Sequence, residues 1–291
     1  MQKYKRSNYL YVLPALLFIV SFVLYPVIFN FYNAFFEWEG LRQDEVTFVG
    51  FSNFLQFFQD PVTPILFKNT AIFLVVTSVV QLGLALILAY VFASGLRFSN
   101  AAKTMIFIPV VTSYVVVGAS FVRLLDRAEG YIPSFFRLIG LDGIANINWL
   151  GDPNYALFTI IAISIWKWTG YDMVLYYSGL MAIPNDLTEA AMIDGANKRV
   201  IFTKIIFPSL RSTHYTCFIL NCIGVFKIFD HVQVLTKGGP GRATQFFSNY
   251  IYLNATELFK QGYASAIAVV LFLITLIVTV IQLRMYSKNA N

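Results

Sequence analysis

Residues 264–286 read ASAIAVVLFLITLIVTVIQLRMY, a run in which Arg284 is the first charged residue. A helix needs roughly 20 apolar residues to cross a bilayer core about 30 Å thick, so this run predicts a transmembrane helix. The same test finds five further stretches, namely Tyr9–Phe36, Thr70–Ser94, Thr104–Leu124, Ala156–Leu180 and Ser209–Phe229. The sequence therefore predicts an all-α integral membrane protein with six transmembrane helices.

The composition favours the same class of protein. Hydrophobic residues make up 58% of the chain and charged residues 12%, against about 45–50% and about 25% in an average soluble domain. Cys217 and Cys222, the two cysteines, lie in an apolar run without CxxC spacing, which favours packing over a metal or redox site. The first stretch is too long, and too poor in a small-residue cleavage site, for a removed signal peptide, so we expect it to be retained.

The distribution of Lys and Arg predicts the orientation. With six spans, both chain ends share a side with the second and fourth loops. The loops on that side are about half as long in total as those on the other side. Their basic residues are Lys3, Lys5, Arg6, Arg97, Lys103, Lys198, Arg199, Lys204, Arg211, Arg284 and Lys288. Those on the other side are Arg42, Lys68, Arg123, Arg127, Arg137, Lys227, Lys237, Arg242 and Lys260. The positive-inside rule then predicts cytoplasmic termini. The basic charge faces anionic lipid, and no nucleic acid is needed to explain it.

Residues 183–197, IPNDLTEAAMIDGAN, predict a short helix on the cytoplasmic side. Pro184 is expected to end the preceding helix, Asp186 to cap the new one, and Glu189 to complete an acidic capping box. Gly195 stands where helices commonly end in the left-handed conformation. A helix this short is marginal alone, so we expect a soluble partner to pack on it.

Several motifs resemble one known family. Glu189-Ala190-Ala191, Gly195 and then Ile205–Pro208 resemble the EAA loop of ABC importer permeases, although that family usually has Leu where Phe207 stands. Four more pieces resemble the sugar permeases related to the maltose permease, in the right order between the right spans: Phe48–Phe54, Ile163–Lys167, Leu235–Gly241 and Gly262–Ala266. The resemblance covers nearly the whole chain and implies the transmembrane domain of a type I ABC importer.

The resemblance also implies partners. In this family the short helix is a coupling helix that docks in a groove of the ATPase subunit, which here implies Asp186, Glu189, Ala190, Ala191, Asp194 and Gly195. The implied partners are a second homologous permease, a cytoplasmic ABC ATPase dimer that binds Mg-ATP, and an extracellular or periplasmic sugar-binding protein. The chain itself is expected to be a transport subunit in the cell membrane, with no catalytic residue, metal or cofactor of its own. Gly238–Gly241 lacks the Lys-Ser/Thr and the strand–loop–helix context of a nucleotide site.

Polar residues in the fourth and fifth stretches predict a substrate site, because such groups are costly at membrane depth and usually functional. Trp168, Tyr171 and Asp172 recur at helical spacing on one face. Aromatic faces with amide and carboxylate groups suit sugar rings. By resemblance, Trp168, Tyr171, Asn221 and Val225 align with sugar contacts of the maltose permease. The predicted substrate-binding residues are Trp168, Tyr171, Asp172, Asn221, Val225, Lys167 and Lys227.

Alternatives stay open from the residues alone. Trp168 and Tyr171 are also compatible with helix packing or an interfacial belt, and Lys167 with an ion pair to Asp172. An autonomous channel or ion-coupled carrier predicts a charged relay and inverted repeats, and a membrane enzyme predicts clustered acidic residues or histidines, whereas His214 and His231 lie apart. A permease for glycerol phosphate or an amino acid would share the short EAA helix, and the sequence does not decide between a neutral and an acidic sugar.

The expected organisation has two parts. Residues 1–69 would form the cytoplasmic tail, the first span and an external loop. Residues 70–291 would form a five-helix permease core, with the coupling loop at 181–208.

Overall fold

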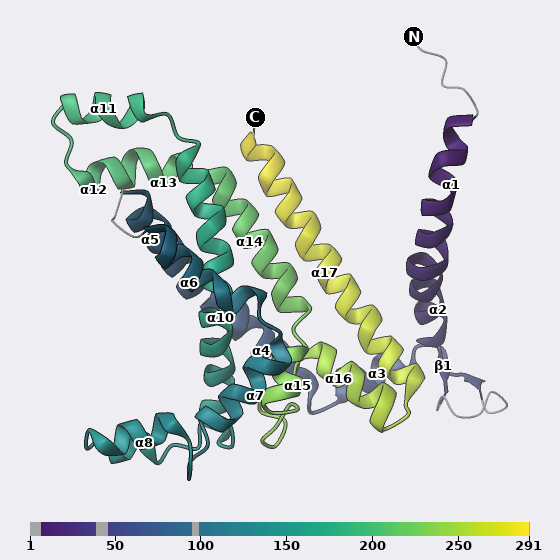
Figure 1. Ribbon diagram of the computed structural model, residues 1–291. Helices are drawn as coiled ribbons and strands as arrows, with labels where there is room; N and C mark the ends of the chain where they lie inside the picture. Colours follow the sequence, from purple (N-terminus) through teal and green to yellow (C-terminus); the bar gives the residue numbers. More distant parts are fainter. Residues whose placement is uncertain (1–6, 39–45, 95–98, 291) are drawn as a thin grey trace. The chain divides into compact units, whose positions relative to one another are not determined.

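The computed structural model describes residues 7–38, 46–94 and 99–290, and it is mostly helical (Figure 1). Its chain divides into two compact units, Met1–Thr63 with Tyr250–Leu276 and Pro64–Asn249 with Ile277–Asn291. The predicted division after residue 69 stays a prediction. The predicted orientation also depends on Lys3, Lys5, Arg6, Arg42 and Arg97, which lie outside the described residues.

The first unit combines N-terminal helices with part of the C-terminal helix. In chain order its elements are α1 (Ser7–Ile19), the π-helical turn η1 (Val20–Leu24), α2 (Tyr25–Asn33), β1 (Phe36–Glu37), β2 (Thr47–Phe48), α3 (Ser52–Gln59), the end of α16 (Phe247–Tyr252), η5 (Leu253–Glu257) and the first part of α17 (Gln261–Ala290). β1 and β2 pair antiparallel, with Phe36 opposite Phe48.

Buried polar contacts fasten this unit. The Asp60 carboxylate accepts hydrogen bonds from the hydroxyls of Tyr250 and Tyr263, the latter at 2.7 Å. The Asn53 amide donates to the carbonyls of Ala34 and Phe36, both at 3.0 Å. Side chains from α3 and the residue after it are thus tied to the backbone just after α2 and in β1, and to α16 and α17.

The second unit holds most of the helices. They are α4 (Thr63–Val76), η3 (Thr77–Gln81), α5 (Leu82–Ala93), α6 (Ser99–Val111), α7 (Tyr114–Leu124), α8 (Tyr131–Leu138), α9 (Asp142–Ala145), α10 (Pro153–Met181), α11 (Asn185–Ile193), α12 (Lys198–Ile201), η4 (Phe202–Ile206), α13 (Phe207–Ser209), α14 (Arg211–Phe226) and α15 (Asp230–Leu235). Figure 1 shows α8 and α11 near opposite ends of α10.

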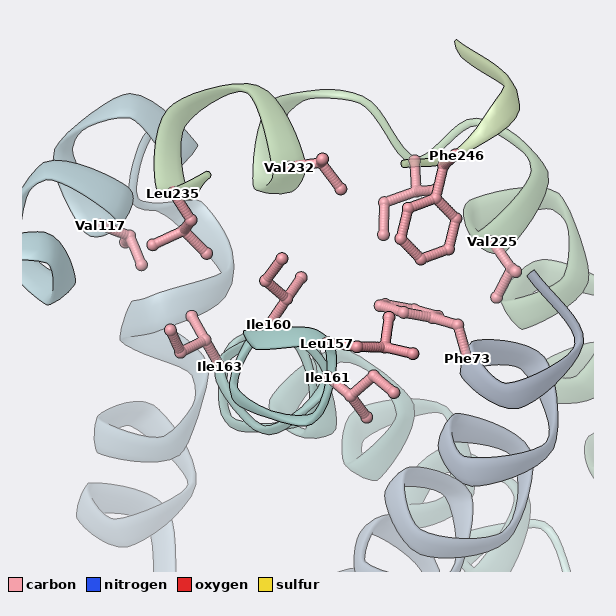
Figure 2. Packing of buried hydrophobic residues seen from close by; sticks show 11 residues of the cluster. Phe73, Val117, Leu157, Ile160, Ile161, Ile163, Val225, Val232, Leu235 and Phe246 are labelled. Atoms are coloured by element: carbon pink, nitrogen blue, oxygen red, sulfur yellow. The ribbon is translucent and has the colours of Figure 1, made fainter. Parts of the chain in front are cut away.

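Helix α10 is the centre of the second unit. It begins at Pro153, which needs no N–H partner at a first helical position, and the Asp152 side chain accepts from the Asn154 N–H at 2.8 Å. Figure 2 shows its apolar side chains against residues of α4, α7, α14 and α15 and against Phe246, in a cluster of Phe73, Val117, Leu157, Ile160, Ile161, Ile163, Val225, Ile228, Val232, Leu235 and Phe246. A Cβ on Gly170 would lie 2.3 Å from the carbonyl oxygen of Ile106, so only glycine allows α10 this close to α6.

Three of the predicted spans meet tests of length and apolarity directly. These helical runs are Tyr11–Asn33, Thr63–Ala93 and Gln261–Met285. The third predicted span was expected to be one helix over Thr104–Leu124, and that is wrong, since α6 and α7 meet at a 97° bend. Pro109 lies in the last turn of α6 and has no N–H to donate, which weakens the helix where it ends. The number of six spans stays a prediction.

The expected cytoplasmic helix is present as α11, with one correction. It begins at Asn185, Pro184 stands at the N-cap, and no side-chain capping hydrogen bond forms, so the predicted Asp186 cap and capping box are wrong. Asp186 instead lies in the first turn, where its charge faces the positive end of the helix dipole. The predicted stop at Gly195 is confirmed: its φ is +81°, its N–H donates to the Met192 carbonyl, and the Ala196 N–H donates to the Ala191 carbonyl.

Candidate functional site

A pocket of about 380 Å³ lies between segments of the second unit. Its walls come from α4, η3, α7, α10, α14 and α15. The residues that line it are Phe73, Gln81, Tyr114, Ser164, Trp168, Tyr171, Asp172, Leu220, Asn221, Ile223, Gly224, Val225, Lys227, Ile228, Phe229, Asp230 and His231. This volume is within the range of small-molecule sites, and a mainly apolar wall with a few polar groups is typical of them.

Two side-chain pairs join η3 to the helices on either side of the pocket. The Gln81 amide donates to the Asp172 carboxylate at 2.6 Å, and the Asn221 amide donates to the Ser78 hydroxyl at 2.9 Å. Asp172 is only 3% exposed, so its carboxylate depends on this bond for much of its solvation. In each pair, one side-chain oxygen can still accept a hydrogen bond from the hydroxyl of a ligand.

Aromatic rings form another part of the wall. The rings of Trp168 and Tyr171 meet edge to face, with centroids 6.2 Å apart at 90°, and those of Tyr114 and His231 lie 3.5 Å apart. Desolvation lowers the pKa of His231 to about 3, with a smaller contribution from the positive charge of Lys167. His231 is therefore a neutral imidazole at pH 7, and it adds no charge to the pocket.

Lys167 has a different position from the other predicted site residues. It is 2% exposed, and its Nζ donates to the backbone carbonyls of Pro109 at 2.6 Å, Val110 at 3.2 Å and Thr112 at 2.6 Å. These carbonyls lie at the C-terminal end of α6, where a positive charge is favourable. This geometry contradicts the alternative in which Lys167 pairs with Asp172, since the Lys167 ammonium donates to carbonyls and the Asp172 carboxylate accepts from Gln81.

The pocket brings together most of the predicted substrate residues. Trp168, Tyr171, Asp172, Asn221, Val225 and Lys227 all line it, whereas Lys167 holds the break between α6 and α7. Sequence reasoning missed Gln81, Ser78, Ser164, Tyr114 and His231. A polar residue inside an apolar stretch was the available indication for Gln81, but only the fold shows that it faces Asp172.

The predicted coupling residues lie together, on α11 and in the two residues directly after it. Asp186, Glu189, Ala190, Asp194 and Gly195 are exposed, and Ala191 is half-buried against the cluster around α5 and α10. Large apolar side chains of this helix also face outward, with Ile193 86% exposed. Exposed apolar surface of this kind suits a protein partner.

Within the described part of the chain, no group of three or more His, Cys, Asp and Glu residues is placed to hold a metal ion. Long apolar helices, together with a pocket of aromatic and polar side chains, fit a membrane transport protein. A family model described as "Binding-protein-dependent transport system inner membrane component" matches residues 10–288, and the chain belongs to this family.

Named relatives and a solved structure agree with that assignment. The chain is 34% identical to the probable ABC transporter permease protein YurN of Bacillus subtilis, over 97% of this chain and 96% of that protein. It is 33% identical to the lactose transport system permease protein LacF of Rhizobium radiobacter, over 98% and 95%. A bacterial alginate ABC transporter, solved with its alginate pentasaccharide-bound periplasmic protein, has a chain of the same fold, with a TM-score of 0.84, 22% identity and coverage of 96% and 93%.

Proposed function

We propose that this chain is the permease subunit of an ABC importer that carries a sugar or oligosaccharide into the cell. The observation that carries the proposal is the pocket, in which Trp168 and Tyr171 stand beside the Gln81–Asp172 and Ser78–Asn221 pairs. Aromatic faces cover the apolar side of a sugar ring, and carboxylate and amide oxygens accept from its hydroxyls. Relatives named for lactose and arabinooligosaccharides support this substrate class.

The charges of the pocket favour an uncharged sugar. Asp172 and Asp230 line it together with Lys227, while the Lys167 ammonium is engaged by backbone carbonyls and His231 is neutral. An acidic sugar would bring its carboxylate close to the carboxylates of Asp172 and Asp230, at a depth where water screens their repulsion little.

Helix α11 supports the proposed coupling to an ATPase. None of its residues is fully buried, so its surface is free to contact a partner, and the left-handed turn at Gly195 fixes where the helix ends. An ATPase dimer that closes on Mg-ATP would move α11, and α10 and α14 would tilt with it, so that the pocket opens to each side in turn. ATP hydrolysis is assigned to that partner and not to this chain, and a second permease would supply the other half of the pathway.

The proposed topology has six spans with both termini in the cytoplasm. α10 and α14 are the fourth and fifth spans. Lys198, Arg199 and Lys204 follow α11, and the positive-inside rule supports a cytoplasmic position for this helix. α8, near the other end of α10, is then outside, where a binding protein would deliver the sugar.

The experiment is uptake of labelled sugars into vesicles that contain this chain with its candidate co-permease, ATPase and binding protein. The panel pairs each neutral oligosaccharide with its uronate counterpart. We expect ATP-dependent uptake of one neutral sugar that is lost in Glu189→Ala while the complex stays assembled. Uptake by this chain alone without ATP would overturn the proposal in favour of an autonomous carrier.

A further inference from the structure

Helix α8 carries an apolar stripe on its surface. Tyr131, Phe135 and Leu138 are 79%, 57% and 84% exposed, and their spacing of four and three residues places them on one face. Ile139, just beyond the helix, is exposed as well. Three large apolar residues in a row on a short helix are more than the scattered exposure of an ordinary surface.

An apolar groove of about 440 Å³ lies between α7, α8 and α10. The residues that line it are Phe121, Leu125, Ile132, Phe136, Trp149, Tyr155, Phe158, Thr159, Ala162, Ile163 and Trp166. The Thr159 hydroxyl, a polar group in this wall, donates to the carbonyls of Trp149 and Tyr155 at 3.0 Å each. The groove therefore offers its occupant a nearly pure hydrocarbon surface.

The groove lies on the side of α10 that faces away from the substrate pocket. Tyr155, Thr159, Ala162 and Trp166 recur at spacings of three and four and line the groove. Trp168, two residues after Trp166, is about 200° further round the helix and lines the pocket. Under the proposed function, a pathway shared with a second permease would run on the pocket side, and the groove side would then face the bilayer.

We propose that this groove binds one acyl chain of an outer-leaflet phospholipid and that α8 lies in the membrane interface with its stripe toward the lipid. The proposal rests on the topology under the proposed function, which places α8 outside. Phe158 and Trp166 are exposed on the span and also line the groove, so its wall is continuous with the surface that meets lipid. Tyr131, Tyr155 and Trp149 are amphipathic aromatic residues of the kind that gather at the interface.

Fluorescence quenching tests the position of α8. The full transporter complex is placed in nanodiscs with brominated phosphatidylcholine, and bimane is attached at Phe135→Cys or Leu138→Cys, with Asp142→Cys on the exposed part of α9 as the control. We expect quenching by the brominated lipid to be several-fold stronger at positions 135 and 138 than at 142. Equal quenching would overturn the proposal. Relief of quenching on addition of the sugar-loaded binding protein would overturn it too, because the stripe would then dock a protein.

Lipid retention tests the groove itself. Ala162 is exposed on α10, so Ala162→Trp fills the groove without disturbing the core, and Ala119→Trp on the exposed side of α7 is the matched control. Native mass spectrometry should show one phospholipid fewer in Ala162→Trp than in the wild type and in Ala119→Trp. An unchanged lipid count would refute the groove site. Uptake by the same preparations reports separately on the proposed function, since substrate transport and lipid retention are measured independently.

Discussion

Replacement of Lys167 by Met tests whether this residue supports the break between α6 and α7 or contacts the substrate. The ammonium uses its three N–H groups on three carbonyls, at 2.6, 3.2 and 2.6 Å, in a position that is 2% exposed. Met has a similar length and no donor. The variant would leave carbonyls at the end of α6 without this partner, while the Pro109 carbonyl keeps the Thr112 N–H at 3.3 Å.

The magnitude follows from those bonds. Hydrogen bonds inside membrane proteins average about 0.6 kcal/mol in double-mutant cycles, so three give about 2 kcal/mol. A buried acceptor that is left without its partner costs roughly 1–3 kcal/mol. We therefore expect Lys167→Met to destabilise the complex by about 2–5 kcal/mol, whereas Lys167→Arg, which keeps the charge and donors, should recover part of that loss.

The assay is thermal unfolding of the purified complex together with sugar-stimulated ATP hydrolysis. At roughly 2–4 °C per kcal/mol, the lower bound predicts a Tm decrease of at least about 4 °C for Lys167→Met. Lys227→Met is the matched control, because Lys227 lines the pocket and its ammonium makes no hydrogen bond to the backbone of the described residues. A normal Tm with a lost sugar response in Lys167→Met would refute the reasoning and restore Lys167 as a substrate contact.

Three further predictions concern the pocket, the coupling helix and the first unit. Asp172→Asn should lower sugar affinity by about tenfold, the equivalent of roughly 1.4 kcal/mol, since a charged acceptor becomes a neutral amide beside Gln81. Isothermal titration calorimetry on the assembled complex measures this affinity, and an unchanged value would contradict a substrate role. Gly195→Ala should cost about 1–2 kcal/mol of local stability and lower coupled ATP hydrolysis, because the φ of Gly195 is +81°. A Cβ would meet no other atom there, so the backbone conformation alone would cause the loss, and Gly195→Asn should stay near wild type. Equal activities of the two variants would exclude the backbone explanation. Asp60→Asn should weaken the bonds to Tyr250 and Tyr263 and lower the Tm, while Tyr250→Phe should have a smaller effect because Tyr263 still donates; the reverse order would argue against the carboxylate as the centre of this cluster.

Local patterns in the sequence predicted the helices and the helix stop well. The apolar runs gave the long helices because twenty apolar residues in a row have few other stable structures, and Gly195 gave the end of α11 because its left-handed φ is a property of one residue. The predicted Asp186 cap failed because Pro184 already supplies the turn into the helix, two residues earlier. The 97° bend at the end of α6 was missed, since an apolar run conceals a break inside it.

The candidate site was predicted as a region more than as a set of contacts, and α10 shows why. Helical periodicity placed Trp168, Tyr171 and Asp172 on one side, and those residues do line the pocket. Periodicity cannot say which residue of another helix faces that side, so Gln81 was not predicted.

Lys167 illustrates the same limit for charge. A buried lysine needs partners, and the sequence offered the carboxylate of Asp172 as the nearest one. The fold provides backbone carbonyls instead, because the break after Val111 leaves carbonyls with acceptor capacity at the end of α6, directly beside α10. The two features therefore explain each other: the break creates the site for the ammonium, and the ammonium stabilises the break. Tyr114, the first residue of α7, lines the pocket. Lys167 therefore fixes part of the pocket wall, although it does not line the pocket itself.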